Sequence, residues 1–195
     1  PINVLVKGEK KAHPGYMWVI AGGKSTDPPH VIYDFRMDRK HENITDLLND
    51  YHGNLHSDKY GAYVKLAEKK QIRWSPCYSH IRRKFIESES ELEFCNWVVR
   101  KIKHLFMYER VAWKRSEEER LEIRREKEKP IIEEITQAIH DQLTNGKVLP
   151  KSKLKTALGY YYSLVPYLKN YTEDPHMRMD NNVAERAIRP LVIGR

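Results

Sequence analysis

Residues 53–76 read GNLHSDKYGAYVKLAEKKQIRWSP, and this stretch decides the fold. Its apolar spacing predicts a short strand over residues 54–57, a helix over 60–69 and a second strand over 72–76 that ends at the proline. A helix between two strands predicts parallel pairing, because the chain must cross back to the end of the sheet where it began. The stretch is therefore typical of an α/β unit.

Strand patterns also precede this unit. Residues 2–6, 16–20 and 31–35 alternate between β-branched or aromatic side chains and other residues, and glycine- and proline-containing turns separate them. Three strands joined in this way predict an antiparallel meander. Residues 41–51 then predict a helix that ends at Gly53. The expected order is three strands followed by helix, strand, helix and strand, which makes a mixed sheet.

Helical periodicity begins after residue 78 and continues to the end of the chain. Val98, Ile102 and Leu105 form one apolar stripe, and Ser116 with Glu119 predicts a capping box that opens a further helix. Pro130 is expected to open another helix at its first turn. Two more helices are predicted over residues 152–167 and 180–188, the last one ending before Pro190.

Composition limits the classes of protein that need to be considered. The chain has 195 residues, 40% of them hydrophobic, and a net charge of +8, so we expect a packed core and a basic surface that favours nucleic acid. No apolar run reaches the ~20 residues of a membrane span, and no leader peptide is visible. The two cysteines indicate a reducing, cytoplasmic setting. Because the chain begins with proline rather than methionine, we expect it to be a fragment.

Asp58 is the first residue with a predicted chemical role. It follows a predicted strand, and the carboxyl ends of strands are where open α/β sheets bind their ligands. The alternative is an ordinary helix N-cap, because a predicted helix starts just after it.

A second group of functional residues lies in residues 180–190, DNNVAERAIRP. Asn181, Glu185 and Arg189 share one helical face because they are four residues apart, and Asn182 and Arg186 lie beside them. One carboxylate among amides and guanidiniums is typical of a metal ligand flanked by phosphate-binding groups. A surface helix with ion pairs is the alternative interpretation.

Residues 77–85, CYSHIRRKF, form a third motif. Cys77 and His80 have the spacing of half a zinc site, but no suitable second pair follows, so a structural zinc site is not expected. Arg82, Arg83 and Lys84 could bind phosphates, or could simply be the solvated start of a helix.

Carboxylates are the predicted catalytic groups, because no glycine-rich phosphate loop or nucleophile elbow is present. Two divalent ions held by acids can activate a water and stabilise the oxygen that leaves a phosphodiester. Asp58 and Glu185 are far apart in the sequence, so only a fold that brings a strand end against a late helix can unite them.

These motifs together resemble the catalytic domain of bacterial insertion-sequence transposases of group sixty-six, the TnpC type. The resemblance covers nearly the whole chain. It rests on residues 15–19 (GYMWV), 31–35 (VIYDF) with Arg39, 55–63 (LHSDKYGAY), 77–85 (CYSHIRRKF), 150–152 (PKS), 180–186 (DNNVAER), 189–190 (RP) and 193–195 (IGR).

The resemblance implies a DDE-type, ribonuclease-H-like core with a large all-α insertion before the last catalytic helix. Residues 1–88 would form the first part of the core, 89–175 the insertion and 176–195 the catalytic helix. Asp58 and Glu185 would be the second and third acids. The first acid would lie just upstream of residue 1, so we expect this fragment to be inactive although the whole protein is an enzyme.

The implied activity is DNA transposition: metal-dependent cleavage of transposon ends and strand transfer into target DNA. Mg²⁺ or Mn²⁺, two ions in the complete site, would be the cofactor. The residues expected to contact DNA or support the acids are His80, Arg82, Arg83, Lys84, Asn181, Asn182, Arg186 and Arg189. The expected partners are transposon-end and target DNA and a second copy of the chain, with no membrane, in the bacterial cytoplasm and associated with the nucleoid. The alternatives are a related nuclease or resolvase, and an inactive DNA-binding remnant.

Overall fold

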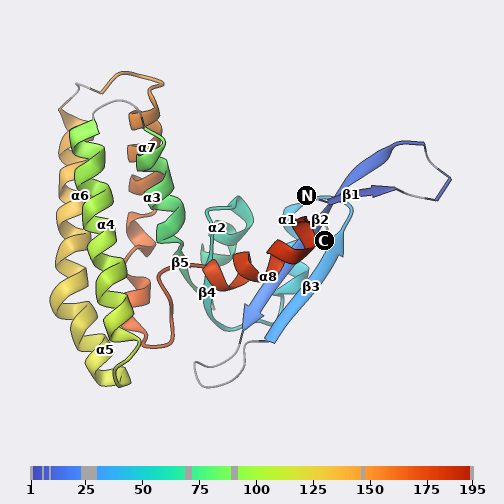
Figure 1. The fold of residues 1–195 in the computed structure, drawn as a ribbon, viewed down its shortest axis with the longest axis horizontal. Helices are drawn as coiled ribbons and strands as arrows, with labels where there is room; N and C mark the ends of the chain where they lie inside the picture. The colour runs from blue at the N-terminus through green and yellow to red at the C-terminus, as the bar shows by residue number, and fades with distance from the viewer. Residues whose placement is uncertain are drawn as a thin grey trace.

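The computed structural model describes residues 2–5, 7–8, 10–22, 30–68, 72–88, 92–145 and 148–193. An α/β part and a lobe of packed helices lie side by side, and the last helix, α8, returns to the α/β part (Figure 1). The strands are β1 (Ile2–Leu5), β2 (Ala12–Gly22), β3 (His30–Arg36), β4 (Gly53–Ser57) and β5 (Ile72–Pro76). The α-helices are α1 (His41–Leu47), α2 (Gly61–Glu68), α3 (Tyr78–Ile86), α4 (Leu92–Ala112), α5 (Glu117–Ile123), α6 (Lys129–Thr144), α7 (Lys153–Tyr162) and α8 (Asn182–Ile193). Shorter turns are the π-helical η1 (Arg124–Glu128) and the 3-10 turns η2 (Val165–Tyr167) and η3 (Asn170–Glu173).

The predicted strand pairings are confirmed. β1, β2 and β3 form an antiparallel meander, with Ile2 opposite Gly15 and Tyr16 opposite Arg36. β4 and β5 pair in parallel, with Leu55 opposite Trp74, and α2 provides the crossover between them.

One mixed sheet was expected, but the described strands form two separate sheets. The register explains the break: β1 pairs only with residues 12–15 of β2, whereas β3 pairs with residues 16–22. The edge of β2 on the side away from β3 therefore has no ladder partner along residues 16–22 within the described residues. The fold class that is observed is mixed α/β, with a large share of helix.

The meander lies between helices on its two faces. Trp18 is buried in a small core with residues of α1, α2 and β5, and its ring lies 5.8 Å from that of Tyr60. Tyr33 lies opposite Val19, so it points to the other face, where its hydroxyl donates a hydrogen bond to the Ala187 carbonyl oxygen of α8 at 2.9 Å. The meander thus supports α8 from one side.

The helical lobe consists of α3 to α7 with the turns between them, and its core continues into β5. Trp74 is 1% exposed, and its ring packs edge-on against Tyr167 at 5.0 Å. The other fully buried members come from α3, α4, α6 and α7: Tyr78, Ile81, Ile102, Leu105, Ile135, Ile139, Leu158 and Tyr161. The shared core fixes β5 against the lobe.

Pro130 lies in the first turn of α6, as predicted. This helix is not set apart from the one before it, because α5, η1 and α6 follow one another without a break and a π-helical turn comes directly before α6. A π-turn changes the hydrogen-bond spacing locally, which accommodates a residue that has no N–H to donate.

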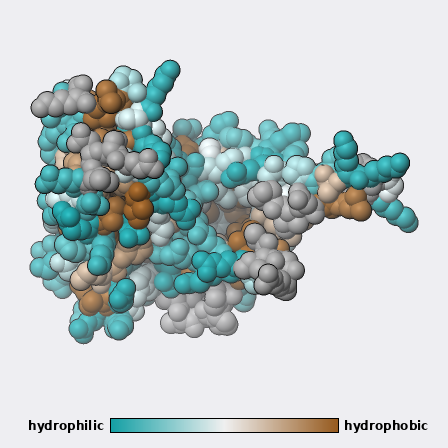
Figure 2. Space-filling view, turned by 45° about the horizontal axis from the view of Figure 1, so that its top comes forward, coloured by the Kyte–Doolittle hydropathy of each residue, from teal (hydrophilic) through white to brown (hydrophobic). Residues whose placement is uncertain are grey.

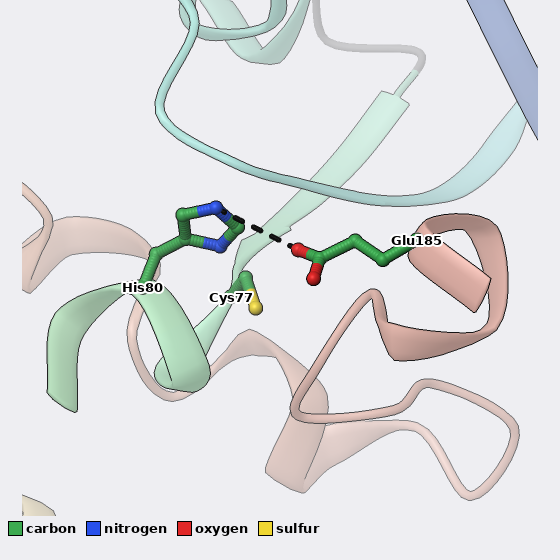
Figure 3. A group of neighbouring side chains, drawn as sticks. All are labelled: Cys77, His80 and Glu185. Carbon is green, nitrogen blue, oxygen red and sulfur yellow. Dashed lines mark ion pairs between the residues drawn. The ribbon is translucent and has the colours of Figure 1, made fainter. Parts of the chain in front are cut away.

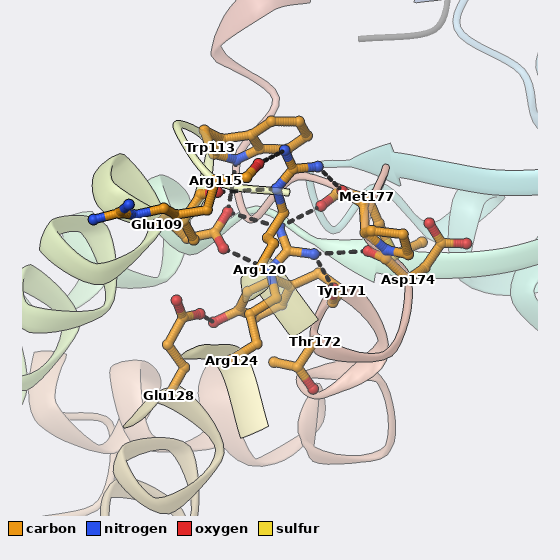
Figure 4. Close-up of polar contacts among 12 residues, drawn as sticks. Glu109, Trp113, Arg115, Arg120, Arg124, Glu128, Tyr171, Thr172, Asp174 and Met177 are labelled. Atoms are coloured by element: carbon orange, nitrogen blue, oxygen red, sulfur yellow. Dashed lines mark hydrogen bonds and ion pairs between the residues drawn. The ribbon is translucent and has the colours of Figure 1, made fainter. Parts of the chain in front are cut away.

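Arg124, in this π-turn, is fully buried and bonds with all five of its N–H groups (Figure 4). Two go to the Glu109 carboxylate, Nε at 2.6 Å and NH2 at 2.9 Å. The other three go to backbone carbonyl oxygens of Tyr171, Asp174 and Met177, at 2.7–2.9 Å. This guanidinium therefore fixes the segment that leads from the helical lobe to α8.

Glu128, one turn further on, is also fully buried. Tyr171 donates its hydroxyl to Glu128 Oε2 at 2.7 Å, while Oε1 has no hydrogen-bond partner within the described residues. Burial, together with the nearby charge of Glu109, raises the pKa of Glu128 to about 8. Glu128 is thus expected to be a neutral acid at pH 7.

The remaining helix predictions differ mainly at the ends. The capping box is confirmed, since Glu119 N–H donates to Ser116 Oγ and Glu119 Oε2 accepts from the Ser116 N–H. α1 and α7 end earlier than predicted. The last helix was predicted to end before Pro190, but Pro190 lies within α8. The proline removes one hydrogen bond to the Arg186 carbonyl, and because both residues are exposed, water can satisfy that carbonyl.

The surface is largely hydrophilic on the face in Figure 2, with separate hydrophobic areas over the helical lobe. In the described part of the chain, no helix combines the length and apolar character that crossing a bilayer requires.

Arg124→Lys is expected to lower the free energy of unfolding by about 3 kcal/mol, because lysine cannot replace a five-donor fork and leaves Glu109 and the carbonyls short of donors. Urea unfolding followed by circular dichroism measures this. Arg125→Lys, an exposed neighbour, is the control and is expected to change stability by less than about 0.5 kcal/mol. Equal effects of the two changes would contradict the proposed importance of the buried fork.

The pH dependence of stability is expected to report on Glu128. Its pKa is raised from 4.5 to about 8, so between these values the folded state holds a proton that the unfolded state has lost. Stability must then fall as pH rises through this window, by at most about 1.4 kcal/mol per pH unit. Urea unfolding at pH 6 and pH 8 should show a smaller fall for Glu128→Gln than for wild type. The exposed change Glu126→Gln should leave the fall unaltered, and a fall that persists in Glu128→Gln would contradict the assignment.

Candidate metal site at the strand ends

The site lies where β4 and β5 end. Because the strands are parallel, their carboxyl ends meet at one edge, with Ser57 opposite Pro76. The next residue of each strand is therefore also close: Cys77 N–H donates to the Ser57 carbonyl at 3.0 Å, directly beside Asp58. The edge thus carries one carboxylate and one thiol.

Asp58 leads the chain into α2 by an Asx turn. Its Oδ1 accepts the Tyr60 N–H at 3.2 Å, and α2 begins one residue later, so Asp58 is not the N-cap residue itself. Its negative charge reaches Tyr160: burial raises the pKa of that tyrosine to about 12, and the Asp58 charge adds to the rise. Oδ2 of Asp58 accepts no hydrogen bond from the described part of the chain.

Cys77 is the residue between β5 and α3, and it is 1% exposed. Burial raises the pKa of its thiol, although the nearby backbone N–H groups of Asn181, His80 and Ser79 oppose the rise. Two of these donors belong to the first turn of α3 and the third belongs to the segment just before α8. The sulfur therefore lies between the starts of two helices.

Glu185 lies in the first turn of α8. Its N–H donates to the Asn181 carbonyl at 3.2 Å, and Asp180 Oδ1 accepts the Asn182 N–H at 3.1 Å, so the segment before the helix is held in place. One Glu185 oxygen lies 3.6 Å from His80 Nε2. The side chains of Glu185 and His80 are 35% and 24% exposed, which leaves the pair open to solvent.

Cys77, His80 and Glu185 form one cluster, which we call the Cys–His–Glu cluster (Figure 3). One ligand atom from each lies within 4.8 Å of the other two. Asp58 is not a member of this cluster, so the predicted metal pair of Asp58 and Glu185 stays a prediction. The structure does place Glu185 beside Cys77, whose backbone is bonded to the residue before Asp58.

Several polar atoms around this cluster are buried without a hydrogen-bond partner in the described residues: His80 Nδ1, Asn181 Oδ1 and both ring nitrogens of His56. Burial lowers the pKa of His56 to about 3, with the charges of Arg178 and His80 adding to the effect. Buried polar atoms normally bond to protein or to ordered water, so a water or an ion near the cluster would satisfy these atoms.

The predicted basic residues lie on the two helices that start at the cluster. On α3, Arg83 and Lys84 follow His80 by three and four residues and so share its face, whereas Arg82 lies on another face. Lys84 Nζ lies 5.8 Å from the centre of the Tyr160 ring, and Lys59 Nζ lies over the same ring at 5.1 Å. On α8, Arg186 and Arg189 are exposed and Asn182 is half-buried. Their contacts with DNA stay predictions.

Sequence reasoning missed Cys77 as a partner of Glu185, and it missed His56 and Tyr160 altogether. The Cys-x-x-His spacing was the available signal for the thiol. The carboxylate of Glu185 comes from a segment more than a hundred residues later, so no local pattern could have joined it to Cys77 and His80.

Fold and site define a mixed α/β protein that carries a cluster of metal-ligand side chains at the ends of a parallel strand pair, with basic helices beside it. The chain belongs to the IS66 family of transposases, because the protein-family model described as "Transposase IS66 family" matches residues 1–195. The resemblance to insertion-sequence transposases of group sixty-six is thereby confirmed.

Relatives of this chain occur in Sinorhizobium fredii, and each is described only as an uncharacterized protein. One, y4qI, is 29% identical over 211 residues, covering 100% of this chain and 38% of the relative. Another, y4hP, is 28% identical over 223 residues, covering 99% of this chain and 39% of the relative. The chain thus spans about two fifths of the length of these relatives. No solved structure matches it.

Asp58→Ala is expected to destabilise the fold by about 1 kcal/mol, because it removes the acceptor for the Tyr60 N–H. Asp58→Asn keeps a side-chain oxygen in the same place and is expected to cost less than about half of that. Thermal unfolding of the two variants measures the difference. Equal stability of both would show that the Asx turn contributes nothing.

Proposed function

We propose that this chain is the main part of the catalytic core of a DDE-type transposase. Family membership supports the general activity, and one structural observation supports the location of the site. That observation is the position of α8: its Glu185 lies beside Cys77, at the strand edge that also carries Asp58. A strand end and a late helix meet there, as a site built from Asp58 and Glu185 requires.

The proposed core is ribonuclease-H-like. The antiparallel meander followed by a parallel strand pair supports this assignment, and α4 to α7 would be a helical insertion between the strand that ends at Pro76 and the catalytic helix α8. In domain terms, we propose residues 1–88 and 176–195 as core and residues 89–175 as insertion.

Asp58 and Glu185, with a further acid expected upstream of residue 1, would hold Mg²⁺ or Mn²⁺, two ions in the complete site. Their carboxylate oxygens suit such hard cations, and the Oδ2 of Asp58, which accepts no hydrogen bond from the described residues, supports this use. Bound ions of this kind stabilise the attacking and leaving oxygens of a phosphodiester.

The proposed reaction has two steps. A water oxygen attacks the phosphorus at a transposon end, and the bond to the 3′ oxygen breaks, which leaves a free 3′-hydroxyl. That hydroxyl then attacks a phosphodiester of the target DNA, so that its oxygen bonds to the target phosphorus and the 3′ oxygen of the target strand leaves as a hydroxyl. Arg186 and Arg189, exposed on the same helix as Glu185, and Arg83 and Lys84 on α3 would bind the phosphates, so DNA affinity should fall with salt. Asn181 and Asn182 would position Glu185, and Arg82 would contact DNA outside the scissile phosphate.

The whole protein would act on two transposon ends as a pair of subunits. Homodimerisation, the cytoplasmic location and association with the nucleoid are proposals that follow from this activity, since cleavage of chromosomal DNA at both ends requires access to the nucleoid.

Asp58→Asn and Glu185→Gln in the whole protein are each expected to lower the rate of Mg²⁺-dependent end cleavage by at least about a hundredfold, because each removes several kcal/mol of charge stabilisation. DNA affinity, measured separately by filter binding, should change little. Glu87→Gln, an exposed change at the far end of α3, is the control and should cleave normally.

The same assay with paired ends and target DNA distinguishes the alternatives. Joined products support a transposase, whereas cleavage without joining would indicate a nuclease or resolvase. Full cleavage by either acid variant would overturn the site assignment. DNA binding without any cleavage by the wild-type whole protein would indicate a remnant.

A further inference from the structure

The Cys–His–Glu cluster has a ligand chemistry that the proposed magnesium site does not use. It offers one thiol, one imidazole nitrogen and one carboxylate oxygen, all within 4.8 Å of one another. Mg²⁺ prefers six oxygen ligands in an octahedron, so a sulfur ligand does not suit it. A thiolate with an imidazole is typical of Zn²⁺ and related cations.

We propose that Cys77, His80 and Glu185 bind one thiophilic divalent cation of the zinc type, with the fourth coordination position open to solvent. This inference goes beyond the proposed function and does not rest on it, although Glu185 takes part in both sites.

The geometry fits a tetrahedral ion. With metal–ligand bonds of about 2.0–2.3 Å, the ligand atoms of such a site lie roughly 3.3–3.8 Å apart. His80 Nε2 and the nearer Glu185 oxygen already lie 3.6 Å apart. The largest separation within the cluster, at most 4.8 Å, needs only a small side-chain rotation to close.

The three ligands are held by fixed elements. Cys77 is the N-cap of α3, His80 lies one turn later on the same helix, and Glu185 lies in the first turn of α8. The two helices are joined at their starts, because Tyr78 N–H donates to the Met179 carbonyl at 3.0 Å. Sites built on regular elements keep their ligands in place better than sites on loops.

The unpartnered atoms around the cluster point to the same occupant. His80 Nδ1, Asn181 Oδ1 and the two nitrogens of His56 are buried without a partner in the part of the chain that the structure describes. Each such atom costs free energy unless water or an ion satisfies it. A bound cation with its water ligand would bring a hydrogen-bonding group to this place.

Cys77 would bind the cation as a thiolate, so binding must displace the thiol proton. When a cation binds, the sulfur–proton bond is replaced by a sulfur–metal bond and the proton goes to solvent, with no change in oxidation state. The nearby N–H groups of Ser79, His80 and Asn181 would then stabilise the thiolate.

The test uses Co²⁺ as a spectroscopic probe of the metal-free whole protein. We expect one Co²⁺ per chain to produce the sulfur-to-cobalt charge-transfer band and the intense visible bands of a tetrahedral site, and Zn²⁺ to displace them. Cys77→Ser should remove the charge-transfer band. Cys95→Ser is the matched control, because Cys95 is the other buried cysteine and lies on α4 away from the cluster, so its change should leave the band intact.

A second variant guards against a simple loss of folding in Cys77→Ser. His80→Gln, at a half-buried position, should lower Co²⁺ affinity at least about tenfold while the far-ultraviolet circular dichroism stays that of wild type. Absence of the charge-transfer band in wild type, or its equal loss in Cys95→Ser with folding intact, would overturn the proposal.

Asp58→Asn separates this inference from the proposed function. It should keep the Co²⁺ spectrum while losing end cleavage. A missing cobalt band together with loss of cleavage in Asp58→Asn would refute the thiophilic site alone. A cobalt band that depends on Cys77, together with full cleavage in Asp58→Asn, would refute the catalytic assignment alone.

Discussion

The buried guanidinium of Arg124 is the interaction on which the position of the candidate site depends. It holds three backbone carbonyls of the segment from Tyr171 to Met177 and is itself neutralised by Glu109. That segment carries the chain from the helical lobe back to α8, and it contains little regular structure of its own. Trp113 packs beside this guanidinium, and the guanidiniums of Arg120 and Arg178 lie 4.0 Å and 4.1 Å from the centre of its ring. A buried charge is costly unless every donor is used, and here every donor is used.

From this segment, a short series of backbone contacts leads to the Cys–His–Glu cluster. The Met179 carbonyl accepts from Tyr78 N–H, and two residues later the Asn181 N–H lies near the Cys77 sulfur. On the other side, Cys77 N–H is bonded to Ser57, the last residue of β4. Three segments that are distant in the sequence therefore meet at Cys77. The positions of these three segments at the site therefore depend on packing in the helical lobe as much as on the strands.

The sequence predicted the local features and failed where distant segments decide the outcome. Alternation in residues 16–20 and 31–35, and the crossover of residues 53–76, were sufficient for the meander and the parallel pair. Pro190 was misinterpreted as a helix boundary, because an exposed carbonyl accommodates its missing N–H. Pro130 does open α6, but the π-turn that joins α6 to α5 could not be predicted from local pattern. The division into two sheets could not be predicted, since it depends on a register that places β1 against only the first residues of β2. The place of Asp58 directly after β4 was predictable from the strand pattern, while its role as a ligand stays a prediction; the approach of Glu185 to Cys77 is a tertiary result.

Glu185 takes part in two proposed sites of different ligand chemistry, and this bears on which ion it would hold. On one side, Cys77 and His80 offer sulfur and nitrogen, with His80 Nε2 at 3.6 Å from the carboxylate. Toward the end of β4, Asp58 offers oxygen alone. A carboxylate has two oxygens, but an ion that takes one of them lowers the negative charge left for another. In the proposed sites, the softness of the thiolate would select the ion beside Cys77, and the number of available carboxylates would select it beside Asp58. The identity of an ion at Glu185 would then follow from which neighbours share it, rather than from Glu185 itself.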